Sequence, residues 1–312
     1  MESVSEKNNT STGYLKKNVI KYGVYIAILT ILLGYVYYTA KTGIESVVFN
    51  TVKTHRWAFD EMNEDFVNDV HVWYSVRNPN HPYILFCHGN VGNISHRKYV
   101  IDMTKQFDCS IILFDYCGYG KSKGMPTTTK ILENGEDVYK WALKKFDIKE
   151  SQLVVMGESL GGSVATHISQ KFNPSKLILL STFSCLTDVA KLGDDIPYYW
   201  KIASVIFTFF IGELPNHQNI SKVKCPIMIL HSKSDSLIPY ANALKNYQSI
   251  PHSNKHLIEI TGDHASPVIT VDDIKKMCEF IGVNKEVDQY FPKKFTKMLK
   301  EIEYDLMNRN YD

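Results

Sequence analysis

Eight consecutive residues, Val155-Met-Gly-Glu-Ser-Leu-Gly-Gly162, join an apolar run (152–156) to a helical pattern (163–171). Within them, Gly157-x-Ser159-x-Gly161 is the spacing of a sharp strand-to-helix turn that presents a serine at the carboxyl edge of a parallel sheet. Glycine is needed on both sides of such a serine, because the strand and the helix pass too close together for a Cβ atom. Ser159 is therefore the predicted nucleophile.

A serine hydroxyl needs a histidine to take its proton and a carboxylate to orient that histidine. In folds with this turn, the chain order is serine, then acid, then histidine. Downstream, Asp235 lies in a loop after one apolar strand, and His264 ends another. We predict Asp235 as the acid and His264 as the base. Asp188 is an alternative acid, whereas Asp263 is too close to His264 to orient its ring.

The chain has 312 residues, of which 44% are hydrophobic, and a formal net charge of +2. This length allows one large α/β domain with appendages. The near-neutral charge, without a basic stripe, predicts that nucleic acid is not a partner. The cysteines form no C-x-x-C pair, which indicates neither a zinc site nor a dithiol redox centre. No metal or organic cofactor is predicted. The six cysteines are Cys87, Cys109, Cys117, Cys185, Cys225 and Cys278.

The amino-terminal region changes character at about residue 19. Residues 1–18 are polar and predict a disordered tail. Residues 22–40 contain no Asp, Glu, Lys or Arg and would form a helix of about 28 Å, close to the hydrocarbon thickness of a bilayer. Tyrosines gather toward both ends of this segment. We therefore predict a transmembrane anchor at 19–41 with the lipid bilayer as a partner; a cleaved signal peptide and a buried core helix are the alternatives.

The orientation of the anchor follows from the lysines beside it. Lys16, Lys17 and Lys21 precede the charge-free segment 22–40, which favours a cytoplasmic amino terminus and a single-pass, type II arrangement. The following domain would then be lumenal or extracellular. In that case, Asn93-Ile-Ser95 and Asn219-Ile-Ser221 are candidate glycan acceptors.

Beyond a predicted linker (42–56), strands alternate with helices. Alternating apolar residues at 70–76 predict an antiparallel edge strand. Continuous apolar runs predict buried parallel strands, and helical patterns lie between them. This rhythm predicts a mostly parallel sheet with helices on both faces. The predicted parallel strands include 83–87, 110–115 and 176–180, and the helices include 95–107 and 128–146.

Two glycine-rich stretches follow predicted strands, at His88-Gly89-Asn90 and at Tyr116 to Ser122. Neither matches a nucleotide-binding motif. The first predicts a loop that gives one backbone N–H to an oxyanion hole, with the second N–H from Leu160, the residue after the nucleophile. His88 is expected to be a structural hydrogen-bonding residue. Asp115 is expected to brace the loops behind the turn.

Together these motifs resemble the α/β-hydrolase superfamily, and within it the Bem46-like serine hydrolases, a group that includes the α/β-hydrolase-domain 13 and 17 proteins. The resemblance extends from about Phe49 to Val283. It implies an α/β-hydrolase fold, Ser159, Asp235 and His264 as catalytic residues, and Asn90 and Leu160 as oxyanion donors. The cysteine-rich, palmitoylated amino terminus of the 17-type proteins is absent, which weakens a transfer of protein depalmitoylation. The residues that carry the resemblance are His88-Gly89-Asn90-x-Gly92-Asn93, Phe114-Asp115-Tyr116-x-Gly118-Tyr119-Gly120-x-Ser122-x-Gly124, Gly157 to Gly162, His231 to Asp235 with Pro239, and Gly262-Asp263-His264.

The predicted hydrolase domain covers 57–285 and carries a lid at about 183–223, where the strand–helix rhythm stops. Residues 196–212 in this lid are strongly apolar. They fit ordinary packing, an acyl-chain pocket or contact with lipid; Lys201 argues against a second membrane span. The carboxyl-terminal tail, 286–312, contains a mixed-charge helix expected to pack on the domain.

The predicted activity is hydrolysis of carboxylic esters or thioesters through an acyl-enzyme. An apolar lid on a membrane-held domain favours lipid-like or lipidated substrates. The alternative is a membrane-tethered binding protein that has the fold without the chemistry.

Overall fold

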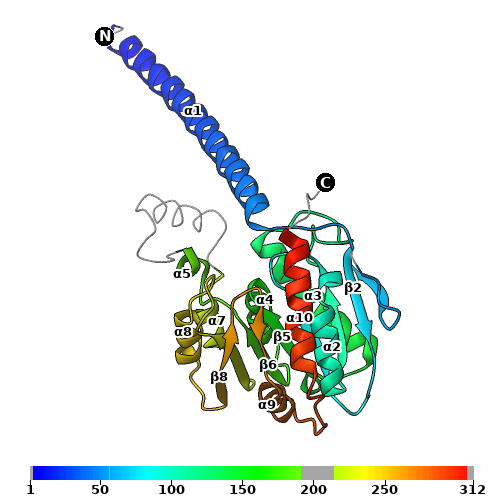
Figure 1. Cartoon of the computed structure of the whole chain (residues 1–312). Coiled ribbons are helices and arrows are strands. Elements are labelled where there is room, and N and C mark those ends of the chain that lie inside the picture. The colour runs from blue at the N-terminus through cyan, green and yellow to red at the C-terminus, as the bar shows by residue number, and fades with distance from the viewer. Residues whose placement is uncertain (1–2, 56, 191–213, 308–312) are drawn as a thin grey trace. The chain divides into compact units, whose positions relative to one another are not determined.

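The computed structural model describes residues 3–55, 57–190 and 214–307. The chain divides into two compact units, residues 1–44 and 45–312. The first unit is most of one long helix, and the second holds the sheet with its covering helices (Figure 1).

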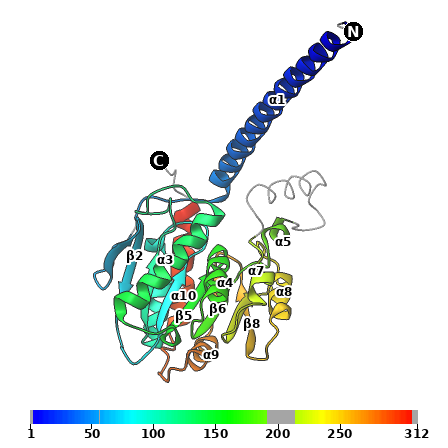
Figure 2. The ribbon, with the colours of Figure 1, turned by 180° about the vertical axis from the view of Figure 1, so that it is seen from behind.

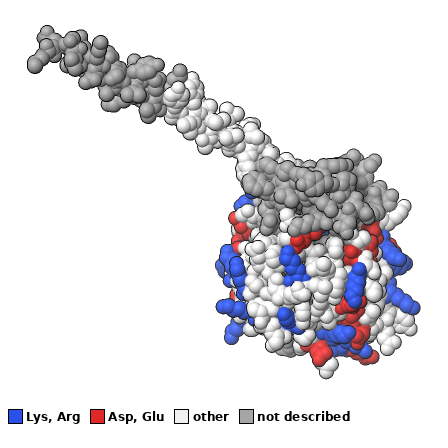
Figure 3. All heavy atoms as spheres, turned by 90° about the vertical axis from the view of Figure 1, so that its left-hand side faces the viewer, with Lys and Arg blue, Asp and Glu red and all other residues white. Residues whose placement is uncertain are grey.

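Helix α1 (Ser3–Val48) contains the predicted membrane span. Its segment Tyr22–Lys41 has 20 residues, a mean hydropathy of 1.6 and no burial within the protein. The Thr30 and Thr39 hydroxyls donate to carbonyls one turn back, which satisfies them inside the helix. The segment has the length and composition to cross a membrane, and white, uncharged atoms cover its described part in Figure 3.

Helix α1 corrects two sequence-based boundaries. It includes residues 3–18, expected as a disordered tail, and residues 42–48, expected as part of a linker. Extending an existing helix adds one hydrogen bond per residue fixed, whereas starting one is the costly step, so an apolar helix can extend into polar flanks. Phe49 and Val52, also in the expected linker, are buried in the second unit. Residues 45–55 are therefore part of the domain.

Nine strands in the described residues form one sheet, in the order β1-β2-β4-β3-β5-β6-β7-β8-β9. The six central strands, β4 to β8 in this order, are parallel. Antiparallel strands border them: β1 and β2 on one side and β9 on the other. The strands are β1 (Asn63–Val67), β2 (Val70–Ser75), β3 (Tyr83–Cys87), β4 (Ser110–Phe114), β5 (Leu153–Glu158), β6 (Lys176–Leu180), β7 (Ile227–Ser232), β8 (Lys255–Gly262) and β9 (Pro267–Val268).

Helices cover both faces of this sheet (Figures 1 and 2). Successive side chains of a strand point to opposite faces, so Leu85 and Ile112 join one core while Ile84 and Leu113 join the other. Runs such as β3 are therefore apolar throughout. The helices of the second unit are α2 (Lys98–Phe107), α3 (Thr128–Phe146), α4 (Leu160–Lys171), α5 (Leu186–Ala190), α7 (Asn216–Ile220), α8 (Ala241–Ser249), α9 (Val271–Ile281) and α10 (Phe291–Met307), with 3₁₀ turns at Ile94–His96 and Glu150–Gln152.

The predicted α/β-hydrolase fold, with a mostly parallel sheet, is confirmed. The predicted edge strand at 70–76 is wrong in its position, because β1 pairs outside β2. The sequence of β1, Asn63-Glu-Asp-Phe-Val67, is charged and did not predict a strand, although its exposed polar groups suit a sheet edge. The apolar part of the predicted lid, 196–212, lies outside the described residues.

The glycan interpretation of Asn93 is also corrected. Its side chain is fully buried, and its amide donates to the carbonyls of Val52 and Thr54, both at 2.9 Å. A glycan on this nitrogen would have no space in the folded domain.

Charges of both signs are interspersed on the face of the molecule drawn in Figure 3.

Candidate active site

Ser159 stands on the turn between β5 and α4 with φ 51° and ψ −119°. A positive φ is strained for a residue with a side chain and costs about 1–3 kcal/mol. The flanking glycines allow this turn: a Cβ on Gly157 would lie 2.3 Å from the Gly161 carbonyl oxygen, and one on Gly161 would lie 2.0 Å from the Cys87 oxygen. The Ser159 N–H is fixed by the Leu180 carbonyl at 3.0 Å. The fold therefore holds the serine at the carboxyl edge of the central strands.

The structure brings the three predicted catalytic side chains together. His264 Nε2 lies 3.1 Å from Ser159 Oγ, and His264 Nδ1 lies 2.8 Å from Asp235 Oδ2. The loop after β7 carries Asp235 and the loop after β8 carries His264, so neighbouring strands place the acid beside the base. These distances fit a tautomer in which Nδ1–H donates to Asp235 and Nε2 accepts from Ser159.

Asp235 is held in place by its own loop. Its other oxygen, Oδ1, accepts from the backbone N–H groups of Leu237 and Ile238 at 3.0 and 2.7 Å. His231 lies 3.4 Å from Oδ2, but burial lowers its pKa, which favours the neutral ring at neutral pH. The carboxylate charge of Asp235 therefore remains available to His264.

The predicted oxyanion loop passes close to the nucleophile. A Cβ on Gly89 would lie 3.5 Å from Ser159 Cβ. The Gly89 carbonyl faces His88 Nδ1 at 2.7 Å and accepts from Arg97 at 3.4 Å. Because a trans peptide points its C=O and N–H in opposite directions, these contacts also set the direction of the Asn90 N–H. Leu160 is the first residue of α4, where backbone N–H groups have no partner within the helix.

The Asn90 side chain has a separate role that the sequence did not indicate. Its amide donates to the Val48 carbonyl at 2.6 Å and accepts from the Tyr119 hydroxyl at 2.7 Å. Thr51 forms a bridge with Gly92 in the same region. Val48, the last residue of α1, and Thr51, just after it, are thereby bonded to the loop that carries the Asn90 N–H.

A cavity of about 410 Å³ opens beside Ser159 and His264. Helix α10 forms much of its apolar wall through Leu299, Ile302 and Leu306. The sequence predicted only that a helix in the carboxyl-terminal tail packs on the domain, because the tertiary position of a terminal helix is not encoded in its own period. The other lining residues are Asn50, Gly89, Asn90, Val91, Arg97, Tyr99, Glu158, Leu237, Ala265 and Glu303.

Charged groups lie in the same cavity. Glu158, the residue before the nucleophile, accepts from the Tyr99 hydroxyl at 2.5 Å and lies 3.9 Å from Arg97 Nε. Burial, followed by the nearby Glu158, raises the pKa of Tyr99 well above its usual value. Arg97 also donates to the Val91 carbonyl at 2.5 Å. Sequence reasoning did not indicate that Arg97 and Tyr99 line this cavity.

The two other aspartates considered near the triad lie elsewhere. Asp188 accepts from Ser184 and Lys245, both at 2.5 Å, and these contacts lower its pKa against the opposing effect of burial. Asp263 accepts from Ser236 and from the backbone N–H of His264 rather than from its ring. In this structure, the carboxylate that contacts the ring of His264 is that of Asp235.

All six cysteines are buried free thiols.

Comparison with known families agrees with this architecture. Residues 82–212 match the family model of the alpha/beta hydrolase fold. The chain has the α/β-hydrolase fold. Among solved structures, this α/β-hydrolase resembles the Pyrococcus furiosus esterase Pf2001, with a TM-score of 0.56 and 18% identity, over 83% of this chain and 100% of that one. Mouse alpha/beta hydrolase domain-containing protein 10 aligns with a TM-score of 0.50 and 20% identity, over 71% of this chain and 96% of that one.

Curated relatives include lipases. The lysophosphatidylserine lipase ABHD12 of Danio rerio is 25% identical over 240 residues, which cover 72% of this α/β-hydrolase and 61% of the relative. The alpha/beta hydrolase domain-containing protein WAV2 of Arabidopsis thaliana is 32% identical over 184 residues, which cover 54% of this chain and 59% of the relative. The aligned part thus spans about three fifths of each of these relatives.

Proposed function

We propose that this α/β-hydrolase is a membrane-anchored serine hydrolase that cleaves carboxylic esters or thioesters. The observation that carries the proposal is the continuous contact from Ser159 Oγ through His264 to Asp235, at 3.1 and 2.8 Å. Such a series of contacts activates a serine hydroxyl that is otherwise a weak nucleophile. The names of two similar proteins, a lipase and an esterase, agree with ester hydrolysis.

The mechanism uses the side chains already described. His264 Nε2 takes the Ser159 proton as Oγ attacks the substrate carbonyl carbon, and Asp235 stabilises the imidazolium. The oxyanion is held by the backbone N–H groups of Asn90 and Leu160. His264 then protonates the leaving alcohol or thiol, which leaves an acyl ester on Ser159. Water, deprotonated by His264, attacks this ester and releases the acid and the free serine.

The cavity supports a lipid-like acyl donor. Leu299, Ile302 and Leu306 give it an apolar wall, and Arg97, Glu158 and Glu303 place charge at the same cavity. Burial of each methylene contributes about 0.8 kcal/mol. An apolar wall together with charged groups suits a lipid ester with one acyl chain and a polar head. The name of one relative, lysophosphatidylserine lipase, agrees with a substrate of this class.

Helix α1 supplies the proposed anchor. The apolar segment Tyr22–Lys41, which has 20 residues and no burial within the protein, supports a single-pass arrangement, and the lysines before it favour a cytoplasmic amino terminus. Tethering at a bilayer concentrates the enzyme where its substrates reside. Protease protection on sealed membrane vesicles tests the orientation: in the type II arrangement, residues 45–312 are protected from protease added on the cytoplasmic side.

The function is tested by labelling the full chain in membranes with a fluorophosphonate probe. Wild type is expected to label, Ser159→Ala to remain unlabelled, and Ser163→Ala, which removes a buried serine one helical turn away, to label like wild type. Hydrolysis of a short p-nitrophenyl ester should follow the same pattern. A folded wild type that neither labels nor exceeds the Ser159→Ala rate would instead identify a binding protein with this fold.

A further inference from the structure

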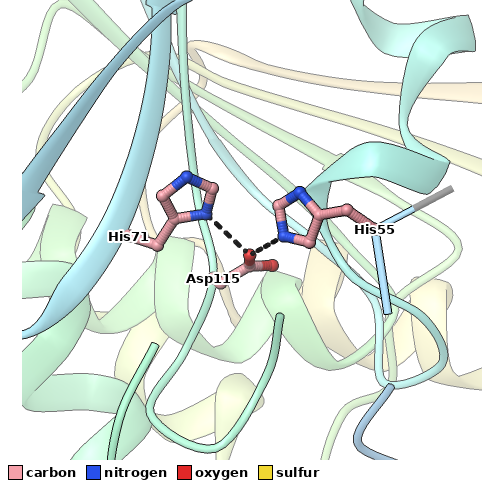
Figure 4. Close-up of side chains that lie close together, drawn as sticks. All are labelled: His55, His71 and Asp115. Atoms are coloured by element: carbon pink, nitrogen blue, oxygen red, sulfur yellow. Dashed lines mark hydrogen bonds and ion pairs between the residues drawn. The ribbon is translucent and has the colours of Figure 1, made fainter. Parts of the chain in front are cut away.

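A second group of chemically reactive side chains lies outside the active-site cavity. His55 Nε2, His71 Nδ1 and Asp115 Oδ2 all lie within 4.8 Å of one another. Both imidazoles point at the Asp115 carboxylate (Figure 4). The three residues come from the segment after α1, from β2 and from the end of β4. Since the fold brings them together from such distant positions, no local sequence motif announces the cluster.

The charge of Asp115 needs a cation. This carboxylate is fully buried, and the ion pairs that it makes within the described residues are all with histidines, at 3.2 Å for His71, 3.5 Å for His55 and 3.8 Å for His88. A buried carboxylate costs several kcal/mol unless a positive charge compensates it. A histidine supplies such a charge only when it is protonated, whereas a metal ion supplies it with neutral imidazoles.

The distances fit metal ligands better than strong hydrogen bonds. A charge-assisted N–H···O bond measures about 2.7–2.9 Å, as between Asp235 and His264 at 2.8 Å. The Asp115 distances to His71 and His55 are 3.2 and 3.5 Å. Tetrahedral zinc with ligands at about 2.0–2.1 Å separates its donor atoms by about 3.3–3.4 Å. An ion would therefore draw the two imidazoles together by at most about 1.4 Å.

The surroundings of both rings also suit a ligand role. In the neutral tautomer of His71 whose Nε2–H donates to Glu64 Oε1 at 2.5 Å, the Nδ1 lone pair faces Asp115. A carboxylate on the far nitrogen is the usual second partner of a metal-bound histidine. His55 Nε2 is buried and makes no hydrogen bond within the described part of the chain. It therefore has a ring nitrogen available to an ion.

Gly120 and Trp73 shape the space around these atoms. A Cβ on Gly120 would lie 2.1 Å from Asp115 Oδ2 and 2.8 Å from His55 Nε2, so any side chain there would collide with both ligands. The Trp73 ring packs edge-on against His55 and His71, with centroids 5.3 and 5.8 Å away. An apolar wall of this kind limits water access and strengthens ion binding.

We propose that His55, His71 and Asp115 form a binding site for a divalent metal ion, with zinc as the best match. Two imidazoles and one carboxylate are a common ligand set for zinc, and a water would complete the tetrahedron. None of these three residues lines the cavity beside Ser159 and His264, so we assign the ion to the fold rather than to the hydrolysis. Asp115 Oδ1 accepts from the Ile94 N–H at 2.8 Å, so an ion at Oδ2 would stabilise the segment that follows the oxyanion loop.

The test uses the full chain in detergent, purified without a polyhistidine tag and freed of metal with a chelator. Zinc and cobalt(II) are titrated separately, and bound metal is counted after equilibrium dialysis. We expect one ion per chain and, with cobalt(II), the intense visible bands of four-coordinate N/O ligation. At a zinc concentration a hundredfold above Kd, the unfolding equilibrium should shift about a hundredfold toward the folded state.

Four variants make the result specific. His55→Gln and His71→Gln should weaken binding at least about a hundredfold, while His167→Gln, which removes a histidine paired with Glu136 at 2.8 Å, should not change it. His55 is partly exposed, so its variant decides the question if His71→Gln does not fold. Ser159→Ala should bind metal like wild type, which separates this proposal from the hydrolase activity. Substoichiometric uptake by wild type, or undiminished cobalt(II) bands in His55→Gln, would overturn it.

Discussion

Asp235 and Asp115 are both buried carboxylates that face histidines, and they differ in what lies beyond the histidine. His264 contacts Asp235 at 2.8 Å and presents its other nitrogen to Ser159 in an open cavity. His71 contacts Asp115 at 3.2 Å and presents its other nitrogen to a second carboxylate, Glu64. The same pair of residue types thus faces a serine hydroxyl in one place and lies in a closed polar cluster in the other. An aspartate–histidine contact indicates catalysis only when the far nitrogen reaches a reactive group.

The largest expected effect is on catalysis at the first pair. Asp235→Asn should lower kcat for a short p-nitrophenyl ester by about 10⁴-fold, because the amide no longer stabilises the imidazolium or fixes its tautomer. Ser159→Ala should lower kcat by at least about 10³-fold. Steady-state kinetics measure both effects. An Asp235→Asn enzyme within tenfold of wild type would break the comparison, because Asp235 would then be no more catalytic than Asp115.

The sequence was most informative where local chemistry determines geometry. The spacing Gly157-x-Ser159-x-Gly161 predicted the turn, since only glycine fits at its flanks, and β5 and α4 lie on its two sides. The apolar runs at 83–87 and 110–115 predicted buried parallel strands because both of their faces enter a core. The candidate triad followed from loops after such strands, and the structure places its three members within hydrogen-bond distance.

The sequence was least informative where distant segments meet. The α10 wall of the cavity, the bonds from Asn90 to residue 48 and the cluster around Asp115 each depend on tertiary contacts that leave no periodic pattern. Strand β1 was missed because it is short and charged at an exposed edge. The absence of C-x-x-C spacing among the six cysteines led to the prediction of no zinc site. The candidate ligands are instead two histidines 16 residues apart in sequence and an aspartate beyond them.

The second prediction concerns stability at Asp115. Asp115→Asn should lower the free energy of unfolding by about 3–5 kcal/mol, because it leaves buried histidines without their carboxylate. Burial opposes ionisation of Asp115, but the neighbouring histidines and the Ile94 N–H outweigh it and lower the pKa of this carboxyl in the folded protein. Its contribution is therefore complete above the unfolded pKa of about 3.9 and is lost as pH falls further. Urea unfolding of both proteins from pH 7 to pH 3 measures this, and a constant difference across that range would contradict it.

The third prediction concerns the pH dependence of stability that His88, one of the histidines facing Asp115, should cause. Burial lowers the pKa of His88 from 6.5 to about 4. Between these values the unfolded chain binds a proton that the folded chain does not, so stability falls by about 3 kcal/mol as pH drops from 6.5 to 4. His88→Gln should remove this decline and retain a donor to the Gly89 carbonyl. Urea unfolding from pH 7.5 to pH 4.5 tests it, with half-exposed His81→Gln as the control; parallel curves for wild type and His88→Gln would refute it.

The smallest expected effect is on acyl-chain preference. It concerns only the cavity beside Ser159 and His264, not the cluster around Asp115. In wild type, each added methylene from butyryl to dodecanoyl esters should raise kcat/KM by up to about fourfold, the equivalent of 0.8 kcal/mol. Leu299→Ala combined with Ile302→Ala should flatten this series and leave acetyl ester rates within about twofold, because both side chains line the cavity. Met298→Ala is the matched control, because Met298 packs against the same core cluster on the same helix but does not line the cavity. An unchanged slope in the double variant, or an equal loss in Met298→Ala, would show that α10 does not bind the acyl chain.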